Sequence, residues 1–441
     1  MDFIKNIQNW KKFPSIETLG YFSPLGNYIY LNEYIDEKDF EKSLKNPLLD
    51  RNRFSVFIHE YQHYLDQVST LWGVKNIYKI YRAFDAAIMS DEYKFFKFRD
   101  LTLELKRNYF LDYYTETYNH IVGDYQNKWK FQITSGLRFD HNGNVNEDYP
   151  IPFISFATNE DVKISRVPIS VVSLLETTAT YAEYEFQISA ISTLQPPHRE
   201  LQLSAISKKL ENKLYHPELT LYSAAVHLTS VNLKIDNPIT AYKISSLFAK
   251  IALNIPTSLF SSITIPNEFN STDEWSRRSK KMVENLDRGF VFYLLIRNYL
   301  DKFGVYNDTE IDVENILSAS NLPEEKDILK IISEEILKLD YDTILEGNNF
   351  SRMIIDKVFF GSKFREQTGI GQQNKREDLT EFIRDKFHFI FNSTYFDYED
   401  LELQPIFIKS MKQMDLTREE WFRLYTFCEK RIDGFNEVCG I

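Results

Sequence analysis

An apolar stripe with a helical period marks residues 52–73. At about 100° of rotation per residue, one face of this segment carries only apolar side chains. These are Phe54, Ile58, Tyr61, Leu65, Val68 and Trp72. His59, His63 and Asp66 fall on the opposite face. The pattern predicts a helix that buries one face in a core and presents the other face to a cleft.

The residues around this segment predict where the helix begins and ends. Asp50 or Asn52 can cap its start, and Gly73 can end it. Upstream, the strand-like residues 28–31 follow turn-forming residues at 24–27, which predicts a small hairpin. A free sheet edge beside the helix could hold an extended peptide by backbone hydrogen bonds. An ordinary hairpin packed on the core explains the pattern equally well.

The rest of the chain alternates helical and strand-like patterns before it becomes almost wholly helical. Residues 74–129 predict two or three helices, and residues 130–170 predict a second β region. Ser170 can cap the helix that follows this region. The sequence therefore predicts a predominantly helical α+β protein. We expect a first domain with a small sheet at 1–197 and a helical domain at 198–441.

The composition of the chain limits the cellular location and the binding partners that we expect. The chain has 441 residues, of which 43% are hydrophobic, so it can build a sizeable core. A net charge of -12 argues against nucleic acid and an anionic membrane surface as partners. No apolar run approaches the roughly 20 residues of a membrane span, and the N-terminus lacks the apolar core of a signal peptide. Because Cys428 and Cys439 cannot form a disulfide framework, we expect a soluble cytoplasmic protein.

Residues 59–63, HEYQH, form an HExxH motif, which is typical of a metal-binding site. On a helix, His59 and His63 lie about one turn apart on one face, and this spacing suits a single zinc ion. A hydrolytic zinc site takes three protein ligands and keeps a fourth position for water. One more donor must therefore come from elsewhere in the chain.

Glu176 is the first choice for this third ligand. It lies early in the capped helix, and Glu176, Thr180 and Glu183 project from one helix face. Hydroxyl and carboxylate neighbours of this kind can orient a metal ligand. A glutamate in the first turns of a helix can also serve the helix dipole alone. Glu183, Glu104 and Glu116 remain alternatives as the third ligand.

Together, HEYQH and the ETTATY patch that begins at Glu176 resemble the motifs of the gluzincin branch of zinc metallopeptidases. In that family a downstream helix supplies a glutamate in an E-G-x-A-x-Y-like context, and Thr177 stands here where glycine is common. The resemblance implies a zincin-like fold for the first domain, with His59, His63 and Glu176 as zinc ligands. It also implies that Glu60 is the general base in the hydrolysis of a peptide or protein substrate.

The motif predicts a mechanism in which zinc activates a bound water. Glu60 takes the proton of this water and passes it to the leaving amine. A further donor should stabilise the oxyanion. The sequence leaves five candidates for this donor: Tyr181, Tyr184, His120, His198 and His227. Asp66, one turn beyond His63, either accepts a hydrogen bond from an imidazole or lies on a solvated face.

Two other interpretations compete with this one. If the HExxH motif arose by chance, both histidines would lie on a solvated helix face. The chain would then be a helical interaction or scaffold protein with a vestigial or non-catalytic site, and its C-terminal helices would bind a protein partner. Residues 60–63 also form the ExxH pattern of carboxylate-bridged di-iron bundles. Those bundles need two such patterns, and the sequence contains one.

Overall fold

A computed structural model describes residues 19–89, 92–108, 110–139, 143–307, 311–339, 349–371, 388–391, 403–412 and 414–440. Within these residues helices predominate, and the strands form two small sheets. The predicted class, α+β with a predominance of helices, is confirmed. Among the same residues, no helix has both the length and the apolar character needed to cross a membrane.

The first sheet contains the predicted hairpin. Strands β1 (Gly20–Ser23) and β2 (Tyr28–Leu31) pair antiparallel. Strand β7 (His388–Phe391), from far along the chain, pairs parallel with the other side of β2. The strand order is therefore β1-β2-β7, which makes β1 an edge strand.

The predicted helix within 52–73 is α3 (Arg51–Ser69), with Asp50 at its N-cap position. Its apolar stripe is buried as predicted. Much of the opposite face is buried too, including Gln62 and Asp66. α3 is therefore a central helix that is covered on most of its surface. Its histidine face meets other helices of the protein.

Gly73 does not end this helix, so that prediction was wrong. α3 stops at Ser69 because Thr70 adopts an extended conformation, and α4 (Leu71–Met89) begins at the next residue. The Thr70 hydroxyl accepts a 3.1 Å hydrogen bond from the Gly73 amide in the first turn of α4. A Cβ atom at Gly73 would lie 2.2 Å from the carbonyl oxygen of Gln67. Glycine is needed here because the two consecutive helices approach so closely.

The predicted β region at 130–170 forms the second sheet, which is antiparallel. Its strand order is β3 (Glu116–Thr117), β6 (Lys163–Pro168), β5 (Val145–Ala157) and β4 (Lys130–Phe139). The chain leaves β6 directly into α6 (Val171–Ser192). Ser170 caps α6 as predicted, in a reciprocal capping box with Ser173.

Helices make up most of the remaining chain. The other α-helices are α2 (Glu37–Lys45), α5 (Phe96–Asn108), α7 (His198–Leu214), α8 (Thr220–Leu233), α9 (Pro238–Asn254), α10 (Asp273–Glu284), α11 (Arg288–Phe303), α12 (Val313–Ala319), α13 (Glu325–Leu337), α15 (Asn349–Thr368), α17 (Leu403–Met411) and α18 (Arg418–Cys439). Short 3-10 helices are η1 (Glu92–Lys94), η2 (Phe110–Tyr114), η3 (Pro217–Leu219), η4 (Thr257–Ser262) and η5 (Asn267–Asn270).

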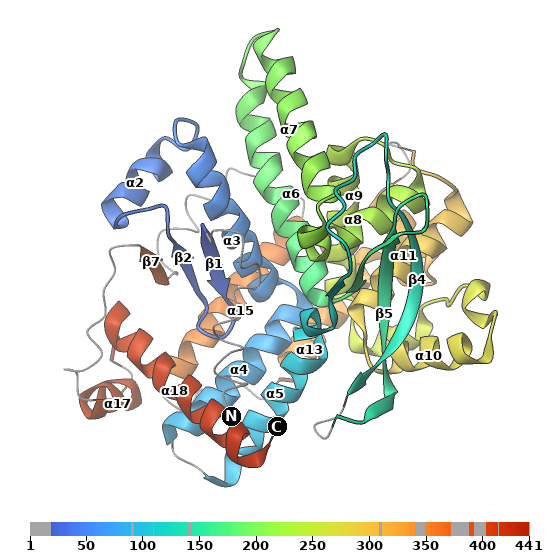
Figure 1. The fold of residues 1–441 in the computed structure, drawn as a ribbon. Coiled ribbons are helices and arrows are strands. Elements are labelled where there is room, and N and C mark those ends of the chain that lie inside the picture. The colour runs from blue at the N-terminus through green and yellow to red at the C-terminus, as the bar shows by residue number, and fades with distance from the viewer. Residues whose placement is uncertain are drawn as a thin grey trace.

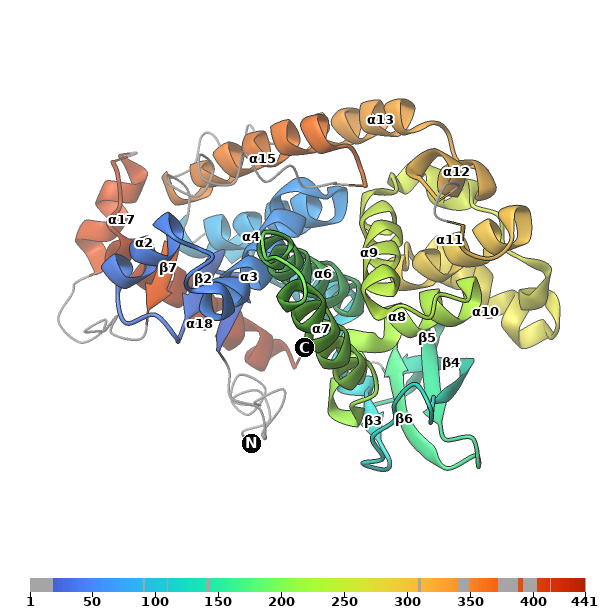
Figure 2. The same cartoon turned by 90° about the horizontal axis from the view of Figure 1, so that it is seen from above.

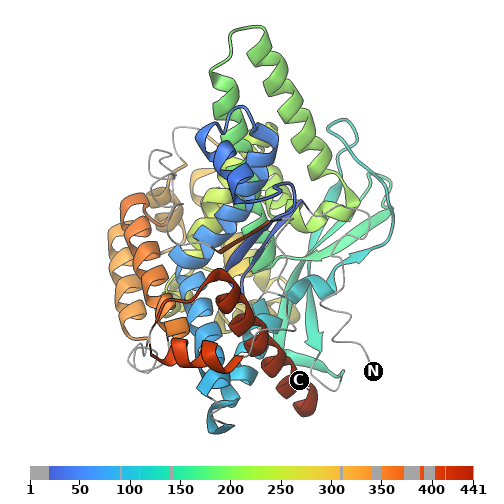
Figure 3. The same ribbon diagram turned by 90° about the vertical axis from the view of Figure 1, so that its left-hand side faces the viewer.

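The centre of the molecule is the crossing of α3 and α6 (Figure 1). α8 and α9 also pack on α6, and α15 packs on both α3 and α4. Seen from above, α13 and α15 line one side of the molecule (Figure 2). α6 and α7 extend together beyond the main body (Figure 3). One hydrophobic core includes elements from both sides of residue 197, and the division into two domains there stays a prediction.

α15 holds the C-terminal end of α3. Nη1 of Arg365 donates a 2.7 Å hydrogen bond to the carbonyl oxygen of Ser69, the last residue of α3. A buried cation thus lies at the negative end of the helix. A Cβ atom at Gly361 would lie 1.7 Å from the Val68 carbonyl oxygen. α15 therefore packs so closely on the end of α3 that position 361 has no room for a side chain.

We expect Gly73→Ala to destabilise the protein by about 1–3 kcal/mol, because its methyl group has no room beside the Gln67 carbonyl. Gly434→Ala is the matched control. Gly434 lies inside α18 with no atom near its hypothetical Cβ, so alanine there should stabilise by about 0.5–1 kcal/mol. Urea unfolding of both variants measures the difference. Equal stability of the two variants would show that the junction of α3 and α4 is looser than described.

Candidate metal centre

The crossing of α3 and α6 brings the three predicted metal ligands together. α3 supplies His59 and His63, whose ring centroids are 5.0 Å apart. α6 supplies Glu176 from its second turn, at a fixed distance from the capping box at Ser170. Because the two helices pack closely along their central turns, the glutamate of one helix reaches the histidines of the other.

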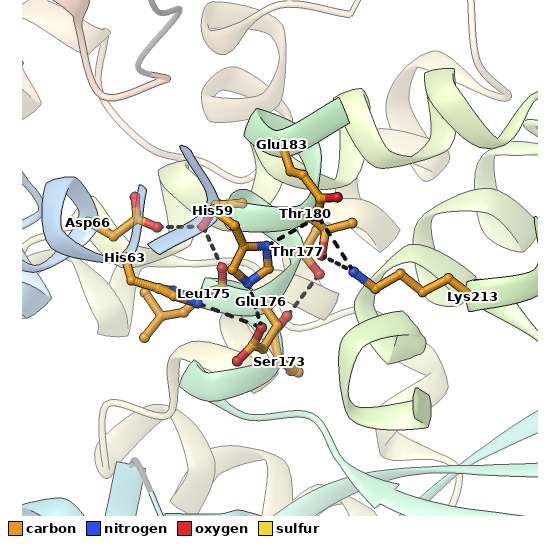
Figure 4. Close-up of polar contacts among 11 residues, drawn as sticks. His59, His63, Asp66, Ser173, Leu175, Glu176, Thr177, Thr180, Glu183 and Lys213 are labelled. Atoms are coloured by element: carbon orange, nitrogen blue, oxygen red, sulfur yellow. Dashed lines mark hydrogen bonds and ion pairs between the residues drawn. The ribbon is translucent and has the colours of Figure 1, made fainter. Parts of the chain in front are cut away.

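The three side chains converge on one point (Figure 4). Oε2 of Glu176 lies 3.4 Å from Nε2 of His59 and 3.7 Å from Nε2 of His63. The three potential ligand atoms all lie within 4.8 Å of one another. The same Oε2 is buried and accepts no hydrogen bond from any described residue. A buried carboxylate oxygen that faces two imidazole nitrogens in this way can hold a metal ion.

The charges in the cluster are strongly coupled. Burial lowers the pKa of His59, but contacts with Glu176 and Glu183 outweigh burial and raise this pKa to about 10. Burial raises the pKa of Glu176, but His63 and His59 hold it far below its ordinary value. In the metal-free protein at neutral pH, a protonated His59 therefore lies between two carboxylates. A bound cation would take over the role of that proton.

Glu183 contacts the other nitrogen of the His59 ring. Its Oε2 lies 3.5 Å from Nδ1 of His59, away from the cluster. Gln187 donates a 3.3 Å hydrogen bond to Glu183, and Nζ of Lys213 lies 4.0 Å from it while donating to Thr180 at 3.2 Å. A carboxylate at Nδ1 fixes the ring and leaves Nε2 free for a metal. The structure thus gives Glu183 the position of an orienting group for His59.

Glu60 lies beside the cluster and is nearly buried, with 8% of its surface exposed. Burial raises its pKa, while the neighbouring His59 and His63 lower it, and the pKa stays above its ordinary value. A raised pKa suits a carboxylate that must take up a proton and release it again. Glu60 thus combines the burial and the pKa shift that a general base needs.

Asp66 does not lie on a solvated face. It is fully buried, and it accepts hydrogen bonds from Gln62 at 2.8 Å and from the hydroxyl of Thr178 on α6. Burial raises its pKa, and the buried Lys250 of α9 lowers it. The carboxylate therefore joins α3 to α6. The predicted hydrogen bond from an imidazole is replaced by these two contacts.

The histidines proposed for the oxyanion lie apart from the cluster. His227 is buried among aromatic rings, and its Nε2 is bonded to the carbonyl oxygen of Leu214 at 2.8 Å. Burial lowers its pKa to about 4, which keeps the ring neutral. His120 is exposed and lies 3.6 Å from Glu218, and His198 is exposed at the start of α7. His227 therefore belongs to the core, and the other two belong to the surface.

The two tyrosine candidates and the alternative third ligands have different surroundings. The hydroxyl of Tyr181 donates to Glu185 at 3.0 Å, and the ring of Tyr184 is buried near Glu183. Of the alternative third ligands, Glu104 pairs with a lysine of α4 and Glu116 is exposed on β3. Among the described His, Cys, Asp and Glu residues, the cluster built on Glu176 is the one group arranged to hold a metal.

Sequence reasoning missed the polar groups that support the cluster from other helices. Thr178 lies in the ETTATY patch, two residues after Glu176, and its position there could have drawn attention. Lys213 and Lys250 reach in from α7 and α9. No local pattern identifies either lysine, because each depends on the packing of a later helix against α6.

The shifted pKa of His59 predicts that zinc affinity depends on pH. Below about pH 10 the metal-free protein keeps a proton on this ring, and a metal ligand must lose it. The zinc Kd should therefore fall about tenfold per pH unit between about pH 6.5 and 8.5. Competition with a chelator of known protonation behaviour measures this slope. A Kd independent of pH would contradict the protonated His59.

Glu183→Gln should weaken zinc binding about 10–100-fold, because the neutral amide no longer fixes the charge and orientation of His59. Glu200→Gln is the control, since Glu200 is an exposed residue of α7. Zinc titration of both variants tests the effect. Loss of all binding in Glu183→Gln would instead mark Glu183 as a direct ligand, and wild-type affinity would remove it from the site.

Comparisons of the chain with protein-family models, with curated proteins and with solved structures gave no match. The geometry of the site is therefore the main support for a function. It consists of three convergent donors from α3 and α6, an orienting carboxylate on His59 and a buried carboxylate beside them.

Proposed function

We propose that this protein is a zinc-dependent metallopeptidase with His59, His63 and Glu176 as zinc ligands. The observation that carries the proposal is the convergence of the buried Glu176 oxygen on Nε2 of His59 at 3.4 Å and on Nε2 of His63 at 3.7 Å. Two histidines and one glutamate are the ligand set of catalytic zinc, which keeps a position for water. Bound zinc would supply an activated water and polarise the scissile carbonyl.

We assign different roles in the reaction to different residues. Glu60 is the general base: it takes a proton from the attacking water and delivers it to the leaving amine. Glu183 holds the His59 ring through Nδ1, and Lys213 keeps Glu183 charged. The side chains of His59, His63 and Glu176 are 12–13% exposed, and this partial burial strengthens the electrostatic interactions among them.

Two features support a peptide as substrate. β1 is an edge strand among the described strands and lies next to α3, and the outward carbonyl groups of such an edge can bind an extended peptide by backbone hydrogen bonds. The HEYQH and ETTATY patches, which resemble the gluzincin motifs, lie on the two helices that cross at the site. On this basis we infer a zincin-like catalytic part, a peptide or protein substrate, and later helices that shape the cleft or bind a protein partner.

A cytoplasmic location is part of the proposal. Cys428 is a free, buried thiol and Cys439 is a free, exposed thiol. Free thiols agree with a reducing compartment. The net charge of -12 favours neither nucleic acid nor an anionic membrane surface as partner.

Substitution of the base and of a ligand separates catalysis from metal binding. Glu60→Gln should keep about one zinc per chain. It should lower peptide hydrolysis about 10²–10⁴-fold, because the amide cannot accept the proton. His59→Ala should lose both zinc and activity, and His198→Ala, at an exposed histidine, should lose neither.

Elemental analysis and a comparison of protein N-termini in cells with wild type or Glu60→Gln measure these effects. A metal-free protein that a chelator leaves unchanged would refute the peptidase and favour the scaffold interpretation. New N-termini that depend on Glu60 would identify the substrate.

A further inference from the structure

The register of the β1–β2 hairpin determines which amides of β1 face outwards. The Asn32 amide donates to the Leu19 carbonyl at 2.9 Å, so these two residues form a hydrogen-bonded pair. In an antiparallel ladder such pairs alternate with pairs that make no bond to each other. Tyr21 therefore bonds to β2, whereas Phe22, opposite Ile29, points its N–H away from β2.

This outer edge of β1 lies over Glu60. A Cβ atom at Gly20 would lie 3.4 Å from Cγ of Glu60 and 3.1 Å from Cγ1 of Val56. The ring of Phe22 packs edge-on against Tyr64 of α3, with centroids 6.3 Å apart. The glycine thus leaves room for the Glu60 side chain to rise to the strand edge. There the outward-facing backbone N–H of Phe22 lies within reach of its carboxylate.

We propose that the Phe22 amide is a positioning group for Glu60, so that the edge strand β1 sets the orientation of the general base. The inference rests on the proposed peptidase function. A carboxylate has two oxygens, and one amide donor occupies one of them. The second oxygen stays available for the proton of the attacking water. Without the donor, the buried carboxylate could rotate about its last bond and lose its alignment.

Backbone positioning explains two features of the local sequence. Gly20 suits this position because a Cβ atom there would lie only 3.0 Å from the Tyr30 carbonyl oxygen and would contact Glu60. β1 is short and at the edge of its sheet, so no other strand in the described part of the chain uses its outward amide. The hairpin thus contributes to the site with its main chain, which no residue motif in the sequence reveals.

Phe22→Pro removes this amide and tests the proposal. Proline is tolerated on a strand edge where the N–H faces outwards. Phe22→Ala is the matched control, since it also loses the ring contact with Tyr64 and keeps the amide. Relative to Phe22→Ala, we expect Phe22→Pro to bind zinc unchanged, to keep KM within about threefold and to lose at least about tenfold in kcat. Equal kcat values in the two variants would overturn the proposal.

Hydrogen exchange provides a readout that does not depend on activity. The Phe22 amide should exchange at least about tenfold faster in Glu60→Ala than in wild type, because it loses its acceptor. In Glu60→Gln the side-chain oxygen still accepts, so protection should persist. The Tyr21 amide, which faces β2, should not change in either variant.

Unchanged exchange at Phe22 in Glu60→Ala would refute the contact and the proposal with it. If Phe22 responds as expected and no variant hydrolyses any peptide, the contact is real and the peptidase function has failed. In that case the positioning role fails as well.

Discussion

The contact of Asp66 with Thr178 is the constraint on which the arrangement of the central helices depends. A buried carboxylate is costly unless hydrogen bonds and an opposite charge compensate it. Asp66 of α3 finds a hydroxyl on α6 and the electrostatic support of Lys250 on α9. Three helices must therefore keep fixed positions relative to one another to satisfy one charge. His63 lies one turn before Asp66, and Glu176 lies two residues before Thr178, so the packing that satisfies Asp66 also sets the spacing of the metal cluster.

The electrostatics of the cluster favour a cation. Glu60, Glu176 and Glu183 place three carboxylates around two imidazole rings in a nearly buried region. In the metal-free protein, the proton of His59 and the ammonium of Lys213 balance part of this negative charge. Such an arrangement is expensive for stability alone, because apolar residues would fill the same space at lower cost. A divalent cation in place of the proton would balance more of this negative charge, which supports the proposal that the cluster binds a metal.

Local sequence patterns predicted the parts of the fold that depend on local rules. The apolar period identified α3, the serine at position 170 identified the start of α6, and the spacing of two histidines identified the face of α3 that meets Glu176. Contacts between distant segments were not predictable. Gly73 looked like a helix terminator, yet it serves a close contact between two helices that only the three-dimensional turn at Thr70 creates. No local sequence pattern marks Lys213. Its contact with Glu183 depends on the angle at which α7 packs along α6.

The residues proposed for catalysis all precede position 197, but several groups that hold them follow it. Strand β7 pairs with β2 and completes the three-stranded sheet of β1, β2 and β7. Arg365 binds the carbonyl oxygen of Ser69, the last residue of α3. Lys213 fixes the carboxylate behind His59, and Lys250 compensates Asp66. α3 thus receives support along its length from α6, α9 and α15, which are separated from it by more than a hundred residues of sequence. A metal site of this kind forms only when the later helices have packed, so metal affinity reports on the folding of the whole chain.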